Sequence, residues 1–150
     1  MSAAGSVALT AGLEATVTAE VTDADTAAAL GSGDVPVLGT PRLLALAEAA
    51  TVAAVAPALA PGQTTVGIEV SLEHSRPAPV GAGIEVRAEL TEIDGRRLVF
   101  MVVGYLSGES AAEAGGGDGD DDGAVIGGGT VQRLLVDRDR FLARAGLTRP

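Results

Sequence analysis

Two segments of the chain alternate between apolar and polar residues, as strands with one buried face do. Residues 15–22 place valine and alanine on one side and mostly threonine on the other. In residues 64–74 one row is Val66, Ile68, Val70, Leu72 and His74, and the opposite row is Gly67, Glu69, Ser71 and Glu73. A period of two predicts a half-buried strand for each segment. We therefore expect His74 to face the core and Gly67 to face away from it.

Three more strands are expected further along the chain. Residues 84–93 alternate in the same way, and Asp94-Gly95 has the chemistry of a two-residue hairpin turn. The next segment, 97–107, is apolar on both faces, which predicts a central strand that is covered on both sides. A last strand is expected at about residues 130–136.

One long helix is expected between the first two strands. Thr40-Pro41 opens it, because a threonine hydroxyl can cap the amides of the first turn and a proline at the first helical position loses no hydrogen bond. Pro57 predicts its end at about Ala56, since proline disfavours helical geometry in the residue before it. Residues 23–39 predict a loop with one helical turn, and a short helix is expected over 137–145.

The predicted order is one strand, one long helix and four strands. One helix against one antiparallel sheet indicates an α+β fold. A chain of 150 residues has the size of a single domain with its own core, so we expect one domain over residues 1–150. Periodicity alone allows several two-layer folds with these elements.

Composition narrows the chemistry. The chain has no cysteine, which excludes disulfides, thiolate nucleophiles and thiolate metal sites. Its formal charge is -10, and its basic residues lack the aromatic interleaving of a nucleic-acid surface, so nucleic acid is not an expected partner. The apolar stretch 43–60 holds Glu48 and Pro57, and we expect a buried helix and no membrane contact. The first residues do not resemble a signal peptide, which predicts a cytoplasmic protein.

An acidic, glycine-rich insert at about residues 111–128 precedes the last strand. Its low complexity predicts disorder. The alternating aspartates from Asp118 to Asp122, with Gly123, match the first half of a calcium-binding loop, yet the twelfth position is Gly129 where such loops carry a bidentate glutamate. We therefore expect a solvated acidic loop and no metal site.

Three polar residues stand where chemistry could use them. Glu48 has Leu44 and Val52 one turn away on the helix, so it either enters apolar surroundings as a general base or lies at the exposed edge of the helix. His74 is the only histidine, and it is either a catalytic imidazole or a satisfied core residue. Thr40 has a sufficient structural role as the helix cap. The spacing of the three leaves open whether they meet.

Four short motifs lie within or beside these elements. They are 37–41 (Val-Leu-Gly-Thr-Pro), 46–50 (Leu-Ala-Glu-Ala-Ala), 67–70 (Gly-Ile-Glu-Val) leading to Glu73-His74, and 128–133 (Gly-Gly-Thr-Val-Gln-Arg). With the spacing of eight and then 26 residues from Thr40 to Glu48 to His74, they resemble the fluoroacetyl-CoA thioesterase-like family. The resemblance extends from about Gly12 to the C-terminus, apart from the acidic insert.

This resemblance implies a hotdog fold, in which an antiparallel five-stranded sheet wraps around one long central helix, and a homodimer. It implies an acyl-CoA thioesterase that needs no cofactor and no metal. Its catalytic residues would be Thr40, Glu48 and His74, with Gly67 and Arg133 contacting the substrate. The aromatic lid of the family would fall at residues 34–38, which contain no phenylalanine, so selectivity for a fluorinated acyl group is not implied.

Two other functions share this fold. One is non-catalytic binding of an acyl thioester, and the other is hydration of an enoyl-CoA, which needs an Asp/His pair on other elements that His74 alone does not supply. Geometry adds a constraint, because eight helical residues at about 1.5 Å each separate Thr40 from Glu48 by about 12 Å along one straight helix. Either the helix begins after Thr40, or the site is completed across a dimer interface.

Overall fold

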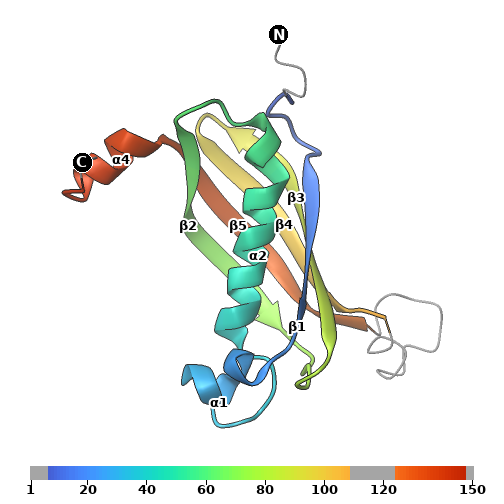
Figure 1. The fold of residues 1–150 in the computed structure, drawn as a ribbon. Coiled ribbons are helices and arrows are strands. Elements are labelled where there is room, and N and C mark those ends of the chain that lie inside the picture. The colour runs from blue at the N-terminus through green and yellow to red at the C-terminus, as the bar shows by residue number, and fades with distance from the viewer. Residues whose placement is uncertain (1–6, 109–123, 148–150) are drawn as a thin grey trace.

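A computed structural model describes residues 7–108 and 124–147 and shows a five-stranded antiparallel sheet curved around one long helix (Figure 1). The strands are β1 (Glu14–Glu20), β2 (Gln63–His74), β3 (Gly83–Asp94), β4 (Arg97–Leu106) and β5 (Val125–Asp137). Their order across the sheet is β1-β3-β4-β5-β2, so β4 is central and β2 is an edge strand. This architecture confirms the predicted α+β class and the hotdog arrangement. The predicted acidic loop around residues 118–122 lies outside the described residues.

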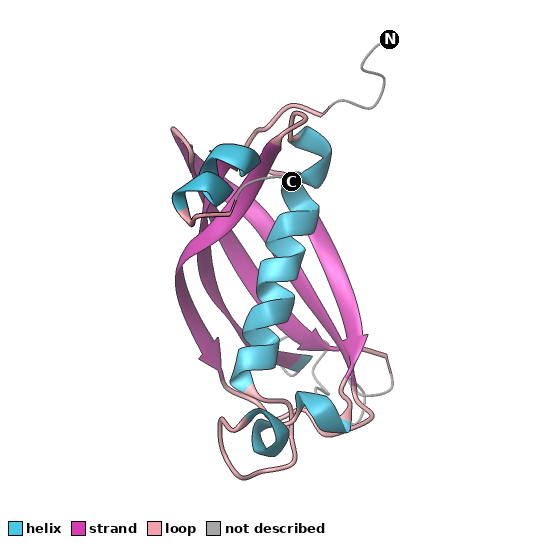
Figure 2. Ribbon diagram, turned by 60° about the vertical axis from the view of Figure 1, so that its left-hand side comes forward, coloured by secondary structure: helices cyan, strands magenta, loops and turns pink. Residues whose placement is uncertain are grey.

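The helices differ greatly in length. They are α1 (Ala27–Leu30), α2 (Thr40–Val55) and α4 (Arg138–Arg144), with short 3-10 turns η1 (Asp23–Asp25) and η2 (Ala56–Ala58). Helix α2 runs along the concave face of the sheet, while α4 leaves the end of β5 and projects past β2 (Figures 1 and 2). One helix therefore supplies almost all the cover for one face of the sheet.

The core lies between α2 and the concave face. Helix α2 buries Leu43, Leu46, Ala47, Ala50, Thr51, Ala54 and Val55. Much of this face is alanine, whose small side chain lets the helix approach the sheet closely, and the sheet contributes larger residues such as Phe100 and Leu90. The stretch Thr40–Ala58 is long and apolar enough to cross a membrane, but its packing against the sheet is that of a core helix.

Strand β4 departs from its prediction on one face. Its central position is confirmed, and Leu98, Phe100 and Val102 are buried against α2. The other face was expected to be covered, but Met101 on it is 55% exposed. Among the described residues no second layer packs on the convex side, so the apolar residues there remain at the surface.

The inward row of β2 was predicted incorrectly because a β-bulge interrupts the strand. Pairing with β5 shifts register between Gly67 and Glu69, which leaves Ile68 unpaired. An extra residue reverses which side chains face the helix on the two sides of the bulge. Consequently Gly67 faces α2, Ile68 is 45% exposed, and Leu72 and His74 keep their predicted inward direction.

Strand β5 begins earlier than predicted, at Val125, so the end of the expected insert is part of the sheet. Gly127, Gly128 and Gly129 pair with β2 on one side and β4 on the other. A Cβ atom at Gly129 would overlap the carbonyl oxygen of Ser71, and one at Gly128 would lie 2.7 Å from that of Val102. The three glycines therefore allow the neighbouring strands to pack closely, although their composition suggested a loop.

The start of α2 also differs from its prediction. The residue in the N-cap position is Gly39, which makes no side-chain cap, and Thr40 is the first helical residue. Pro41 was expected at the first helical position and is the second helical residue, still within the first turn. Thr40 is therefore not the helix cap, and its hydroxyl is available for another contact.

Candidate active site

The hydroxyl of Thr40 is hydrogen-bonded to the imidazole of His74. Its Oγ1 lies 2.8 Å from Nδ1, which joins the first residue of α2 to the last residue of β2 across 34 positions of sequence. The contact forms because His74 faces the helix beyond the bulge in β2 and because Gly39, at the N-cap, leaves the Thr40 side chain free. Two of the three predicted catalytic residues therefore meet.

The second nitrogen of His74 lacks a hydrogen-bond partner in the described part of the chain. Nε2 is buried and makes no hydrogen bond to any residue in the described ranges. Burial lowers the pKa of His74 below the ordinary value of 6.5, and the nearby backbone of Arg76 acts in the opposite direction. The imidazole is accordingly neutral near pH 7, and one nitrogen is held by Thr40 while the other is left for a ligand.

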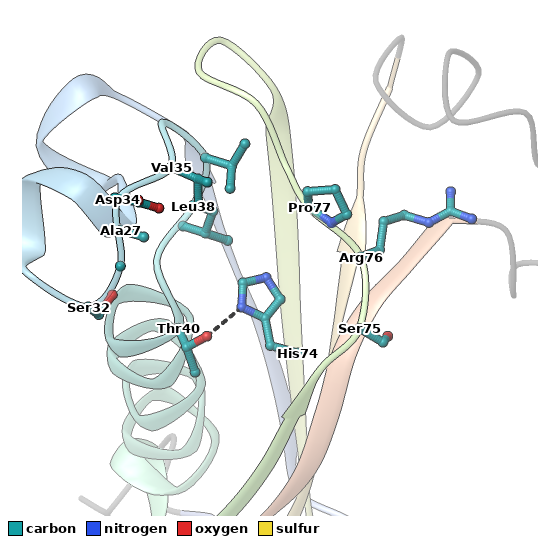
Figure 3. A pocket seen from close by; sticks show the side chains of 12 residues that line it. Ala27, Ser32, Asp34, Val35, Leu38, Thr40, His74, Ser75, Arg76 and Pro77 are labelled. Atoms are coloured by element: carbon teal, nitrogen blue, oxygen red, sulfur yellow. Dashed lines mark hydrogen bonds between the residues drawn. The ribbon is translucent and has the colours of Figure 1, made fainter.

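A cavity of about 330 Å³ opens beside this pair (Figure 3). Its lining includes Ala27, Val35, Val37 and Leu38, with Thr40 and His74 at one side. The imidazole ring points up between Leu38 and Pro77 (Figure 3). The segment where the family's aromatic lid was expected thus lines the cavity with Asp34 and three aliphatic residues, Val35, Val37 and Leu38, and with no aromatic ring.

Glu48 lies two turns further along α2 in a different cluster. Its Oε2 accepts a hydrogen bond of 2.9 Å from Nη1 of Arg133 on β5. Arg133 also donates from Nε to Oγ1 of Thr65 at 2.8 Å and from Nη2 to the Thr65 carbonyl at 2.9 Å. The guanidinium is thereby fixed by three hydrogen bonds, and it fixes one oxygen of the carboxylate in turn.

Burial differs sharply between the two charged partners. The side chain of Arg133 is 8% exposed and that of Glu48 is 36% exposed. Burial lowers the pKa of the Arg133 guanidinium below its ordinary value, and the Glu48 carboxylate opposes that shift. Glu48 is therefore neither in wholly apolar surroundings nor a free surface group, because one oxygen is paired with a buried cation and the side chain remains open to solvent.

Gly67 completes this second group, which we call the mid-helix cluster: Glu48, Thr65, Gly67 and Arg133. A Cβ atom at Gly67 would overlap Oε2 of Glu48 and lie 3.4 Å from Nη1 of Arg133. A larger residue at this position would displace the carboxylate, because Oε2 occupies the space of its side chain. The predicted substrate contacts of Gly67 and Arg133 remain predictions, while their contact with Glu48 is direct.

Sequence reasoning missed Thr65. Strict alternation placed it in the outward row, but it lies before the bulge and is 8% exposed. Its signal in the sequence is indirect: a buried arginine needs several hydrogen-bond partners, and a threonine on the paired strand can provide two of them.

Thr40 and Glu48 do not meet within one chain. Both belong to the continuous helix Thr40–Val55, so the possibility that the helix begins after Thr40 is ruled out. Eight residues at about 1.5 Å place them about 12 Å apart along the axis. Among the described residues no group of three His, Asp or Glu side chains is arranged to hold a metal ion.

Comparison with known proteins identifies the family. The family model described as fluoroacetyl-CoA-specific thioesterase matches residues 21–115. Fluoroacetyl-CoA thioesterase of Streptantibioticus cattleyicolor is 32% identical over 108 residues, which cover 72% of this chain and 67% of that protein. The chain belongs to the fluoroacetyl-CoA-specific thioesterase family. It is a thioester hydrolase with a hotdog fold.

Solved structures agree with this assignment. A structure of fluoroacetyl-CoA thioesterase matches with a TM-score of 0.76 and 26% identity, covering 96% of this chain and all of that one. A thioesterase superfamily member from Thermus thermophilus matches with a TM-score of 0.76 over 92% of this chain and 91% of its own, and at 23% identity it supports the fold alone. These matches therefore agree with the sheet and the long helix of this chain.

Proposed function

We propose that this protein hydrolyses the thioester of a small acyl-CoA, using Thr40, Glu48 and His74. The observation that carries the proposal is the Thr40–His74 hydrogen bond of 2.8 Å beside a cavity, with the second imidazole nitrogen buried and unpartnered among the described residues. A buried polar atom without a partner is costly in a folded protein, and a bound ligand or water can satisfy it. Membership of the family supplies the reaction class.

The acyl group would occupy the cavity beside His74. Aliphatic residues such as Val35 and Leu38 give it an apolar side, polar residues such as Asp34 line the remainder, and no phenylalanine narrows it. A volume of about 330 Å³ suits a short acyl chain with the thioester near the imidazole. Selectivity for a fluorinated group is not part of the proposal, since the segment 34–38 lacks the expected aromatic residue.

The active form would be a homodimer joined through β2. This edge strand is 12 residues long and exposes Ile68 at 45% and Val70 at 37%. A long edge strand with exposed apolar side chains invites pairing with another strand, and a second copy of β2 would cover it. Antiparallel pairing would extend the sheet across both subunits around the bulge at Ile68.

Such a dimer would also bring the two polar groups closer. Within one chain, Gly67 and His74 are seven residues apart along β2, or about 23 Å at 3.3 Å per residue. In a symmetric antiparallel pair centred at Ile68, the other copy's Gly67 would lie opposite residue 69, which is about 17 Å from His74 at the same spacing. Glu48 of one subunit would then serve the cavity of the other.

In the proposed reaction, Glu48 activates a water molecule for attack on the thioester carbonyl carbon, or attacks it directly to form an anhydride that water opens. In the first route the C–S bond breaks after water has added, and in the second it breaks as the anhydride forms, before water opens it. The thiolate of CoA takes up a proton from His74, and a proton that the water loses replaces it. Thr40 orients the imidazole. The positive end of the α2 dipole lies beside Thr40 and favours the carbonyl oxygen as it becomes negative. The residues alone can supply this chemistry, so the proposal includes no cofactor.

The test is release of free thiol from a panel of acyl-CoAs of increasing chain length. We expect cleavage of short acyl groups and a decline as the chain outgrows the cavity. Saturable binding of acyl-CoA without thiol release would instead indicate a non-catalytic binder, and hydration of an enoyl-CoA would indicate a hydratase. A monomer at micromolar concentration by light scattering would contradict the dimer. The cytoplasmic location stays a prediction.

A further inference from the structure

A second, smaller hollow lies at the other end of the molecule, against α4. It has a volume of about 70 Å³ and is lined by Arg96, Arg140, Arg144, Phe141, Val136 and Asp137. Arg96 stands in the turn between β3 and β4, whereas the other two arginines and Phe141 belong to α4. Three cations from two separate elements therefore share one hollow.

These three guanidinium groups are unusual in a chain of net charge -10. Arg42, Arg87 and Arg133 each pair with a carboxylate at 3.0 Å or less, and Arg97 donates to Gln132. By contrast, the side chains of Arg96, Arg140 and Arg144 form no ion pair or hydrogen bond with any residue in 7–108 or 124–147. Three like charges beside a single carboxylate repel one another, and a bound anion relieves that repulsion.

One carboxylate, that of Asp137, also lines the hollow, so three guanidinium groups share it with a single acidic side chain. Asp137 caps α4 by accepting a hydrogen bond of 2.9 Å from the backbone N–H of Arg140. The neighbouring aromatic ring also fits a ligand, because Phe141 is half-buried at the rim whereas Phe100 is wholly buried in the core. An aromatic face beside a group of arginines is suited to a phosphorylated nucleotide, whose base can stack while its phosphates are bound.

We propose that Arg96, Arg140 and Arg144 bind the phosphates of the adenine nucleotide end of coenzyme A, with Phe141 contacting the base. This inference rests on the proposed function. A strongly acidic protein repels a polyanionic substrate, so a local group of unpaired cations is needed to hold it. The site would bind the part of the substrate that lies outside the acyl cavity.

The position of the hollow implies that it serves the other subunit. Asp137, from which α4 continues, pairs with Gln63 at one end of β2, whereas His74 is at the opposite end. In an antiparallel β2–β2 dimer, Gln63 of one copy lies near His74 of the other. Helix α4, which projects past β2 (Figure 1), would then lie beside the other copy's acyl cavity.

The test compares two substrates with the same acyl group, one on CoA and one on pantetheine, which lacks the nucleotide. For the variant Arg96→Gln/Arg140→Gln/Arg144→Gln we expect the KM for acyl-CoA to rise at least about tenfold, since each charge-assisted hydrogen bond lost contributes at least that factor. Its kinetics on acyl-pantetheine should equal those of the wild type. Arg138→Gln, on the same helix but outside the hollow, is the matched control and should leave both substrates unaffected.

A direct binding measurement accompanies the kinetics. Calorimetric titration with adenosine 3′,5′-bisphosphate should show binding to the wild type, weakening with added salt, and a large loss in the triple variant. An unchanged KM for acyl-CoA, or an equal loss on acyl-pantetheine, would overturn the site. If the wild type cleaved neither thioester, the proposed function itself would fail. Nucleotide binding that the triple variant abolishes would still support the site in that case.

Mixed dimers test which cavity the site serves. One chain carries His74→Ala and the other carries the triple arginine substitution, so that each homodimer is defective. If the arginines serve the partner's cavity, the mixed dimer holds one cavity with both an intact His74 and intact arginines, and low-KM turnover of acyl-CoA returns. Absence of that recovery would overturn the assignment to the other subunit.

Discussion

The two polar groups on α2 differ in how completely their hydrogen bonds are satisfied. At the N-terminal end, Thr40 holds one nitrogen of His74, and the other nitrogen is buried without a partner among the described residues. In the middle of the helix, the guanidinium of Arg133 makes three hydrogen bonds and holds one oxygen of Glu48. In the first group one imidazole nitrogen is left for a ligand. In the second group all the described hydrogen bonds serve to hold one carboxylate in position.

This difference indicates different tasks. A neutral imidazole with a free nitrogen can donate to or accept from a substrate, which requires that it be left partly unsatisfied. A carboxylate that attacks or activates water must instead be held in one position, and a buried arginine does that while leaving the second oxygen open to solvent. The following predictions test whether the two groups act in these ways.

The largest effect is expected from Glu48→Gln. Glutamine retains an oxygen that can accept from Arg133, so the fold should be kept, but it cannot serve as base or nucleophile. We expect kcat for a short acyl-CoA to fall by about 10⁴-fold or more, which is the loss typical of removing a catalytic base or nucleophile. Thiol release and the thermal unfolding midpoint are measured together.

Glu48→Ala is the contrasting variant, because it also leaves a buried donor of Arg133 unpaired and should lower the midpoint. Near-normal turnover by folded Glu48→Gln would remove this carboxylate from the mechanism.

His74→Ala should be the next most damaging change. A positioned imidazole contributes about 10²–10⁴-fold, and we expect a loss in this range that is smaller than that of Glu48→Gln. Turnover is expressed per folded molecule, with the folded fraction taken from circular dichroism. If the variant kept its turnover and lost only stability, His74 would be a core residue and the Thr40–His74 pair would have no part in the reaction.

Gly67→Ala tests the fixed position of the carboxylate. The added methyl group would overlap Oε2 of Glu48, so the carboxylate must move away from Arg133. A displacement of about 1 Å at a catalytic group can cost about 10²-fold in rate, and we expect kcat to fall by about that factor. Thr64→Ala, on the same strand, is the control and should be nearly neutral. Full activity of Gly67→Ala would show that the mid-helix cluster tolerates a shifted Glu48.

The smallest expected effect is the dependence of stability and of kcat/KM on pH that arises from the titration of His74. Burial lowers the pKa of His74 below 6.5 in the folded protein, so the unfolded chain binds a proton first as the pH falls. The contribution to stability is therefore complete above pH 6.5 and is lost as the pH falls from there through the folded-state pKa. We expect the acid limb of kcat/KM to lie below 6.5 as well, and to disappear from the residual activity of His74→Gln. An acid limb above 6.5 would show that the imidazole is not buried as described.

Much of the fold could be predicted because it depends on local pattern. Alternation over 15–22 and 84–93, and the prolines at 41 and 57, place the strands and the long helix within a few residues of β1, β3 and α2. These signals act between neighbours in the chain, so the sequence carries them directly. The spacing of Thr40, Glu48 and His74 along the chain likewise points to one family.

Pairing between distant strands determined the rest. The bulge at Ile68 exists only because β2 pairs with β5. Against the simple alternation, Thr65 contacts Arg133 and Gly67 lies against Glu48. The glycines at 127–129 pack between two strands although their composition resembles a loop. Thr40 was expected to cap the helix, but contact with a residue 34 positions away gives its hydroxyl another partner. The sequence by itself determined the elements and the candidate residues. Only the tertiary structure decided which of these residues touch, because register and side-chain direction depend on partners that local patterns do not contain.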